Sequence, residues 1–306
     1  MEAGNNQPLR ILVHCDLDAF YASVETIFRE LDPNLPLIIG SDPLNGNGRG
    51  IVSTCNYSAR KYGIRSAMPI SEAWRRCPAK PFGNAIYVKG NYRLYSRASR
   101  KVMEILSQNC DIFEQASIDE AYLDVTNLCS SDWDKAFELC QNIQDKIFQS
   151  TGLTASFGLS STRILSKMCS EINKPNGIFR LLPENIPGFF LDKNVRDVPG
   201  IGKKSATQLA EWGLTTVDEV YQAGELSIER MMGERFASWI IRVYEGKTSS
   251  EISPLKSRKS ISKEHTFSSD QANIEIVLQK LDSLCELVMN KANSCLLYTS
   301  DAADEV

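Results

Sequence analysis

The chain has 306 residues, with 34 Lys and Arg against 38 Asp and Glu and a formal net charge of -4. This length can bury the cores of about two or three domains, which excludes a peptide-sized module. No segment approaches the ~18 apolar residues of a membrane span, and the N-terminal MEAGNNQPLR lacks the apolar core of a signal peptide. We therefore expect an intracellular protein without a membrane anchor.

The cysteine and histidine content excludes two common kinds of site. The nine cysteines are scattered without a C-x-x-C pair, and the only histidines are His14 and His265. A structural zinc site and a histidine-based triad therefore lack ligands or a base. Single scattered cysteines are typical of reduced core thiols in a reducing compartment.

The chain up to residue 181 alternates predicted strands and helices. Apolar residues at positions 11, 12, 13, 15 and 17 predict a buried strand over 10–18, and helical spacing follows it. A hairpin is expected over 110–126, with Asp119 and Glu120 near its middle. The other predicted strands are LPLIIG, GIVSTC, TASFGLSS and IFRLL, and further helices are predicted over 91–109, 132–150 and 161–173. Residues 9–181 are thus expected to form one α/β unit with an excursion at about 29–87.

The chain changes character at residue 182. The segment VRDVPGIGKKSATQLAEW places P-G-I-G between two helical patterns, and no strand is expected before residue 250. A small helical domain is therefore predicted. The Ser/Lys-rich GKTSSEISPLKSRKSISK follows as a linker-like segment, and residues 270–293 have the pattern of an amphipathic helix.

Asp16, Asp119 and Glu120 are acids within apolar strand patterns, where an unpaired charge is costly. A cation should compensate them, and carboxylates without histidine or cysteine suit Mg²⁺ or Mn²⁺ rather than zinc. The D-L-D pattern at 16–18, taken alone, also fits a structural ion pair. Adjacent strand residues face opposite ways, so Asp119 and Glu120 can reach one site only where the hairpin bends.

Two metal ions bridged by carboxylates can clamp the attacking and leaving oxygens of a phosphoryl transfer. Such chemistry needs cations and donors for the departing phosphates, and the sequence offers Tyr57, Arg60, Lys61 and Lys174. Arginine binds phosphate through a fork of N–H donors, lysine as a point charge and tyrosine through its hydroxyl. Each of these residues, taken alone, also fits an ordinary surface position.

Six motifs stand out along the chain. They are HCDLDAFYASVE (14–25), STCNYSARKYGIRSAMP (53–69), ASIDEAYLDVT (116–126), SFGLSSTRILSKMCSEINKPNG (156–177), VPGIGKKSATQL (198–209) and RKSISKEHTF (258–267). Together and in this order they resemble the motifs of the Y-family, or translesion, DNA polymerases, most closely those of the DinB branch.

The resemblance implies an α+β fold in the form of a right hand. Its parts would be a palm with a ferredoxin-like mixed sheet, small fingers, a helical thumb containing a helix-hairpin-helix, and an incomplete little-finger domain. The implied boundaries are 9–28 and 88–181 for the palm, 29–87 for the fingers, 182–250 for the thumb and 256–293 for the start of the little finger.

The resemblance also assigns a catalytic centre. It implies that Asp16 and Asp119 bind two Mg²⁺ ions, which Mn²⁺ can replace. The Leu17 carbonyl would join one coordination shell, and Glu120 would hold the catalytic ion. Tyr21 takes the steric-gate position, where its ring fills the space of a ribose 2′-hydroxyl, and Phe20 belongs to the same nucleotide shelf.

The remaining contacts implied by the resemblance are to nucleotide and DNA. Thr54, Tyr57, Arg60 and Lys174 match triphosphate contacts, Ile51, Ser53 and Ala67 match the roof over the nascent base pair, and Gly200, Gly202, Lys203, Lys204, Arg258 and Lys259 match DNA-backbone contacts. The P-G-I-G turn fits a helix-hairpin-helix whose N–H groups grip phosphates without reading sequence. The basic segment around Arg258 fits a strand along the DNA backbone, and also a solvated linker.

The sequence departs from the family at its C-terminal end. One strand and one helix cannot form a sheet-based little finger, so we expect this end to be poorly packed. Residues 295–306, CLLYTSDAADEV, match nothing in the family and back-translate into a sequence like a transposase sequencing adaptor. We therefore expect a non-native tail there and a longer natural protein, with any sliding-clamp segment lying beyond it.

The expected partners are primer–template DNA, deoxynucleoside triphosphates and a sliding clamp, and the chain itself is expected to be a monomer. Its compartment would be the nucleus of a eukaryote or the cytoplasm of a prokaryote. Two alternatives stay open. The first is another palm-type nucleotidyl enzyme, such as a nucleotide cyclase, which uses the same two-metal carboxylate site but does not bind a DNA primer. The second is a DNA-binding protein that truncation has left without catalytic activity.

Overall fold

The computed structural model describes residues 10–254 and 260–301. Their contacts divide them into two compact units. The first contains residues 10–27 and 91–254, and the second contains residues 28–90 and 260–301. No helix of these residues is both long and apolar enough to cross a membrane.

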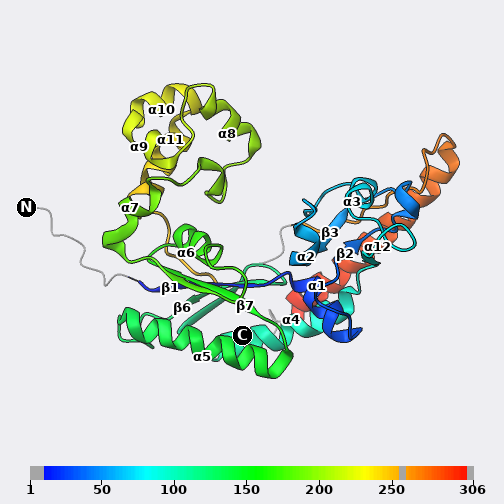
Figure 1. Ribbon diagram of the computed structural model, residues 1–306, viewed down its shortest axis with the longest axis horizontal. Helices are drawn as coiled ribbons and strands as arrows, with labels where there is room; N and C mark the ends of the chain where they lie inside the picture. Colours follow the sequence, from blue (N-terminus) through cyan, green and yellow to red (C-terminus); the bar gives the residue numbers. More distant parts are fainter. Residues whose placement is uncertain (1–9, 255–259, 302–306) are drawn as a thin grey trace, which may run out of the picture. The chain divides into compact units, whose positions relative to one another are not determined.

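A five-stranded mixed sheet forms the centre of the first unit (Figure 1). Its strands are β1 (Leu12–Leu17), β5 (Ile112–Gln115), β6 (Glu120–Asp124), β7 (Ala155–Ser160) and β8 (Ile178–Arg180), in the order β5-β6-β1-β7-β8. β1 pairs antiparallel with both β6 and β7, whereas β7 and β8 are parallel. The predicted N-terminal strand and the predicted hairpin are confirmed, and they are neighbours in the sheet.

Helices cover both faces of this sheet. α4 (Tyr92–Ser107) and α5 (Trp133–Thr151) lie on one face, and α6 (Arg163–Ser170) lies on the other (Figure 1). All six residues of β1 are buried because both faces are covered, which explains its nearly continuous apolar pattern. α6 approaches the sheet closely at Gly158, where a Cβ atom would lie only 2.1 Å from the Ser166 carbonyl oxygen.

α1 (Phe20–Phe28) follows β1 directly and brings further aromatic side chains next to the sheet. Phe20 belongs to the same hydrophobic core as the buried residues of β1, and Tyr21 packs against that core. The strand-to-helix junction therefore places these two aromatic residues a few positions after Asp16.

The rest of the first unit is helical, as predicted for 182–250. It contains α7 (Ile186–Phe190), α8 (Lys203–Ala210), α9 (Val217–Ala223), α10 (Glu225–Met232) and α11 (Glu234–Tyr244), with 3-10 turns at Pro183–Asn185 and Val195–Asp197. Thr216 and Glu219 form a capping box that begins α9. Leu165 and Met168 of α6 belong to the same hydrophobic core as these helices, so α6 joins the helical part to the sheet.

A three-stranded sheet forms the core of the second unit. β2 (Leu37–Gly40) lies between β3 (Val52–Cys55) and β4 (Ile86–Val88), antiparallel to β3 and parallel to β4. Short helices accompany it: η1 (Leu44–Gly46), α2 (Tyr57–Arg60) and α3 (Ile70–Arg76). The two sheets with their helices confirm the α+β class.

The segment expected to form a basic strand differs from that expectation. Residues 260–273 contain no strand. A strand needs a neighbour for its backbone hydrogen bonds, and no strand follows among the described residues up to 301. Arg258 and Lys259 lie outside the described residues.

The predicted amphipathic helix is present as α12 (Ile274–Asp301). Its side chains Ile274, Leu281 and Met289 are 64%, 51% and 59% exposed. An apolar helix face without a covering layer gains little from hydrophobic burial. These described side chains of α12 are poorly packed, as expected.

Candidate active site

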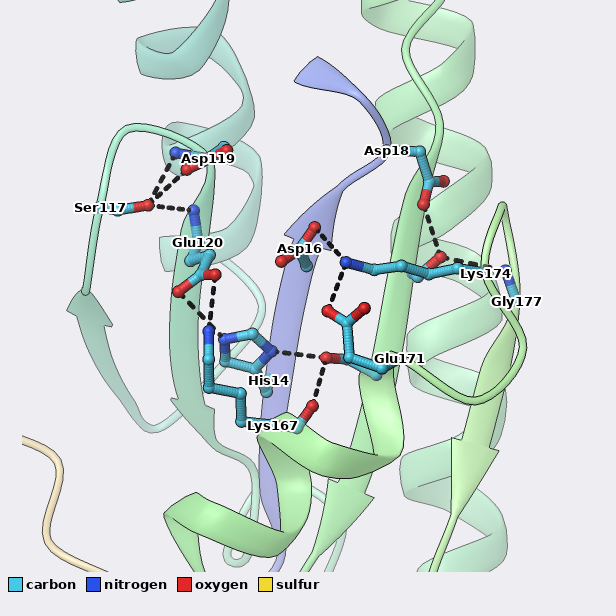
Figure 2. Close-up of polar contacts among 12 residues, drawn as sticks. His14, Asp16, Asp18, Ser117, Asp119, Glu120, Lys167, Glu171, Lys174 and Gly177 are labelled. Atoms are coloured by element: carbon cyan, nitrogen blue, oxygen red, sulfur yellow. Dashed lines mark hydrogen bonds and ion pairs between the residues drawn. The ribbon is translucent and has the colours of Figure 1, made fainter. Parts of the chain in front are cut away.

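The three acids lie at the same end of two neighbouring strands. Asp16 on β1 and Glu120 on β6 are directly opposite in the antiparallel register. The Leu17 N–H donates to the Asp119 carbonyl oxygen at 3.0 Å and holds the turn before β6 against the end of β1. Asp119 lies in this turn and Glu120 begins the strand, so the hairpin bends at the point where a site shared by these two acids needs it to bend (Figure 2).

Ser117 orders the turn that contains the adjacent acids. Its hydroxyl donates to Asp119 Oδ1 at 2.5 Å. Its oxygen accepts from the N–H groups of Asp119 and Glu120 at 3.1 and 3.0 Å. This local side-chain-to-backbone arrangement fixes the orientation of Asp119 before any ligand binds.

Asp16 is buried and holds a lysine. Its Oδ1 lies 2.7 Å from Lys174 Nζ, which also contacts Glu171 Oε1 at 2.6 Å. Burial raises the pKa of Asp16 to about 7, although Lys174 acts in the opposite direction. Burial also acts to lower the pKa of Lys174, but the two carboxylates outweigh it and raise that pKa above its usual value. Lys174 is therefore a charged counter-ion of Asp16.

Glu120 is more open and has different neighbours. Its Oε1 lies 2.6 Å from Lys167 Nζ, and its Oε2 lies 3.7 Å from His14 Nε2. His14 and Lys167 hold the pKa of Glu120 below its usual range. His14 is fully buried, and burial lowers its pKa. At neutral pH the carboxylate is therefore ionised beside a neutral imidazole.

Asp18 has a structural role. Its Oδ1 accepts from the Ser156 hydroxyl at 2.8 Å, and its Oδ2 accepts from the Asn176 N–H at 2.8 Å. Asn176 lies two residues after Lys174, so Asp18 fixes the loop that follows this lysine. The two acids of the D-L-D pattern thus divide their roles: Asp16 pairs with Lys174, and Asp18 orders the loop.

The donor set suits a hard divalent ion. Asp16, Asp119, Glu120 and the Leu17 carbonyl offer only oxygen, which favours Mg²⁺ or Mn²⁺. No three His, Cys, Asp or Glu side chains in the described part of the chain are close enough to hold an ion together. Lys174 and Lys167 instead neutralise Asp16 and Glu120. The residues fit an ion by their chemistry, and its binding requires Asp16 and Glu120 to exchange their lysine partners.

Tyr21 is supported by an aromatic cluster. Its ring stacks on Tyr95 with 4.2 Å between ring centroids and meets the edge of Tyr92 at 5.8 Å. Tyr95 is fully buried, and its hydroxyl donates to Glu25 at 2.6 Å. Phe20 is 2% exposed and packs in the core. The cluster limits the positions that the Tyr21 ring can take, as a steric gate requires.

The predicted triphosphate and roof residues other than Lys174 belong to the second unit. Asn56 begins α2 by accepting from the Ala59 N–H, which places Tyr57 and Arg60 on one short helix. The Arg60 guanidinium lies 4.6 Å from the centre of the Tyr57 ring. The other residues in this set are Thr54, half-buried on β3, Ser53, half-buried beside it, and Ile51 and Ala67, both exposed. Their approach to the carboxylates stays a prediction.

The predicted helix-hairpin-helix turn leads into α8. Gly200 has a φ of 105° and Gly202 precedes the helix without a side-chain cap. Lys203 and Lys204 are exposed in the first turn of α8. The turn thus presents uncapped N–H groups and two ammonium groups, which is a suitable arrangement for phosphate.

Sequence reasoning missed Lys167, Ser170 and the contact role of His14. Lys167 and Ser170 are three residues apart after β7, and this helical spacing is the signal that could have placed them on one face of α6. Their link to Glu120 and His14 joins segments far apart in the sequence. That link becomes visible only when α6 is laid on the sheet (Figure 2).

Comparison with known proteins identifies the family. A family model described as the impB/mucB/samB family matches residues 15–171. DNA polymerase IV 2 of Methanosarcina mazei is 37% identical over 284 residues, covering 93% of this chain and 75% of that protein. The chain belongs to the Y family of DNA polymerases. DNA polymerase IV of Streptococcus suis is similarly related, with 38% identity over 92% of this chain and 78% of its own.

Solved Y-family structures match the fold. A Y-family DNA polymerase chimera, Dbh-Dpo4(243-245)-Dbh, has a TM-score of 0.83 and 30% identity, covering 92% of this chain and 80% of the chimera. DinB from Sulfolobus solfataricus has a TM-score of 0.71 and 31% identity, covering 79% and 68%. The chain thus has the right-hand polymerase fold of a translesion DNA polymerase, and enzymes of this family generally depend on divalent metal ions. A cyclase or a non-catalytic scaffold is not favoured.

Proposed function

We propose that this Y-family polymerase extends a primer 3′-end with deoxynucleotides at Asp16, Asp119 and Glu120, using two Mg²⁺ ions that Mn²⁺ can replace. The observation that best supports this is the placement of the three acids at one end of β1 and β6, with Lys174 against Asp16. When bound, the two ions would activate the primer hydroxyl and neutralise the departing pyrophosphate. The Leu17 carbonyl would complete one coordination shell.

The protein's own residues orient the nucleotide. Lys174 has an ammonium group that can leave Asp16 for a phosphate oxygen, because both are anionic acceptors. Thr54, Tyr57 and Arg60 would add hydroxyl and guanidinium donors to the same triphosphate. Fixed donors of this kind lower the barrier by positioning and by stabilising developing charge.

Tyr21 would select deoxyribose over ribose. Its ring is held in position by Tyr95 and Tyr92. The 2′-hydroxyl of a ribonucleotide would therefore clash with a ring that cannot move aside. Phe20 supports this shelf from the core. Ile51, Ser53 and Ala67 would form the roof over the nascent base pair, and the bulk of Ile51 would limit which damaged bases fit.

DNA would be held through its backbone. Gly200, Gly202, Lys203 and Lys204 would bind duplex phosphates, with Arg258 and Lys259 adding a second contact. Related structures described as insertion ternary and post-insertion binary complexes of Dbh DNA polymerase support primer–template DNA and deoxynucleotides as partners. We further propose a monomer whose palm, fingers and thumb follow the boundaries given from the sequence. It would work in the compartment that contains DNA, with a sliding clamp as a further partner.

Primer extension tests the proposal. The parent chain, Mg²⁺, four deoxynucleotides and a primed template at low salt should give elongated primers. The Asp119→Ala, Glu120→Ala double variant should give none while its circular dichroism spectrum stays that of the parent. Asp145→Ala, an exposed acid on α5 on the opposite face of the sheet from α6, is the matched control. Full extension by the double variant would remove the metal assignment.

A further inference from the structure

Lys167 is the direct partner of Glu120. Their Nζ and Oε1 atoms are 2.6 Å apart, and their side chains are 29% and 27% exposed. At this distance the lysine occupies one of the two carboxylate oxygens. The other oxygen faces His14 Nε2 at 3.7 Å, which is too long for a hydrogen bond.

Hydrogen bonds beneath the site connect His14 to the backbone of Lys167. The Ser170 hydroxyl donates to the Lys167 carbonyl oxygen at 2.8 Å. Ser170 Oγ also lies 2.8 Å from His14 Nδ1, so this one hydroxyl links the imidazole to the backbone of Lys167. Nε2 is a buried atom without a hydrogen-bond partner.

Close packing of α6 on the sheet positions the backbone of Lys167. Gly158 lies opposite His14 in the β1–β7 register, and a Cβ there would lie 2.2 Å from the Ser170 backbone nitrogen. The missing side chain lets α6 pack directly on the sheet, with Ser170 against His14. Lys167, one turn earlier on α6, then reaches over β1 to Glu120 (Figure 2).

We propose that Lys167 is a built-in counter-ion that neutralises Glu120 in the metal-free protein and competes with the divalent ion for this carboxylate. Lys167 is a positioning residue, because it acts on the ion only through Glu120. The inference rests on the proposed metal role of Glu120 and goes beyond it. It makes metal binding an exchange of one cation for another.

A cavity next to α6 can accept the Lys167 side chain after a metal ion displaces it. Lys167 lines a cavity of about 670 Å³ between α6 and the turn before α8. Glu171 and Asp197 line the same cavity and offer carboxylates, next to the cations Lys193 and Arg196. A rotated Lys167 side chain would therefore keep its ammonium group near acids and water. The Lys167 ammonium group can therefore leave Glu120 without losing all of its polar contacts.

The competition has a measurable consequence. Two ligands that exclude each other weaken each other's binding by the same factor, so removing the ammonium group should tighten metal binding. The Lys167→Met variant should bind Mn²⁺ about tenfold more tightly than the parent, within the usual range for coupling between two binding events. Loss of a supporting residue would ordinarily weaken binding, so the direction of the change is diagnostic.

Electron paramagnetic resonance of Mn²⁺ titrated into the protein, without DNA or nucleotide, measures this directly. Lys167→Arg keeps the charge and should bind like the parent. Lys146→Met removes a lysine from α5 on the opposite face of the sheet and should also bind like the parent. Lys167→Gln keeps most of the side-chain stem, should tighten binding as the Met variant does, and provides the comparison if the Met variant does not fold.

Unchanged or weaker Mn²⁺ binding in the folded Lys167→Met or Lys167→Gln protein would overturn the proposal. Equal tightening by Lys146→Met would also overturn it, because the effect would then come from overall charge. Primer extension distinguishes this failure from failure of the proposed function. A parent chain that extends primers, together with a Lys167 variant that binds Mn²⁺ no more tightly, would refute the counter-ion role alone.

Discussion

Asp16 and Glu120 are opposite each other across β1 and β6, and each is paired with a lysine, yet the two sides of the site behave differently. The Asp16 side chain is 12% exposed and the Glu120 side chain 27%. Burial raises the pKa of Asp16 to about 7, whereas His14 and Lys167 lower the pKa of Glu120. The comparison shows that an acid–lysine pair alone does not set the direction of a pKa shift: Asp16 is more deeply buried, whereas Glu120 has His14 beside it in addition to its lysine.

The largest expected effect is on the buried side. Asp16→Asn keeps the shape of the side chain but removes the charge that Lys174 and a metal ion would share. Primer extension should slow by roughly 10³-fold or more, as expected for loss of a group that stabilises transition-state charge. Single-turnover nucleotide insertion measures this rate. A rate within a few-fold of the parent would mean that Asp16 is only the structural partner of Lys174.

Lys174 tests the link between Asp16 and the nucleotide. Lys174→Ala removes one charge-assisted contact, which lowers kcat/KM for the incoming nucleotide by about 10- to 100-fold. Steady-state kinetics with varied nucleotide check this, with Lys146→Ala as the control. A KM and kcat that both match those of the parent would show that Lys174 only pairs with Asp16 in the metal-free protein and does not bind the triphosphate.

The pH dependence separates the two carboxylates. Because the pKa of Asp16 is raised to about 7, a proton occupies this carboxylate below pH 7 and must leave before an ion binds. Mn²⁺ affinity should fall about tenfold between pH 8 and pH 6, while Glu120, with its lowered pKa, stays ionised throughout. Calorimetric titration measures this dependence. It should be lost in Asp16→Asn, and its persistence there would assign the proton to another group.

The smallest expected effect concerns the support under the Glu120 side. Ser170→Ala removes the donor to the Lys167 carbonyl and the hydrogen-bond partner of His14 Nδ1. Unfolding free energy should fall by about 1–3 kcal/mol, the cost of leaving buried polar groups unpaired. Urea denaturation measures the change. Ser107→Ala, where the hydroxyl is exposed, is the control and should change stability by less than about 0.5 kcal/mol.

The sequence predicted the parts of the fold that depend on local patterns. β1 was recognisable because a strand covered on both faces is apolar at nearly every position, and α4 and α5 because their caps and periodicity are regular. Strand geometry set a bend near Asp119 as the condition for a site shared with Glu120, and the structure has a bend there. The basic strand around 258–267 was wrong over residues 260–267, because local composition does not show whether a neighbouring strand exists.

The acids of the candidate site were also predictable, since charges inside apolar strands are unusual. The lysine partners were not equally visible. Lys174 was assigned to phosphate, and its pairing with Asp16 appeared only in the structure. Lys167 and Glu120 are 47 residues apart, and they meet because Gly158 allows α6 to pack on the sheet. Long-range pairs of this kind depend on packing, which a local pattern does not encode.

Template-directed nucleotide insertion is the decisive test of whether the three acids form a polymerase active site. Each of the four deoxynucleotides is offered singly, with Mg²⁺, to the parent chain on four primed templates that differ only in the next template base. We expect insertion that follows the template base in each case and is absent from the Asp119→Ala, Glu120→Ala variant. Insertion independent of the template base, or equal insertion by the double variant, would contradict it.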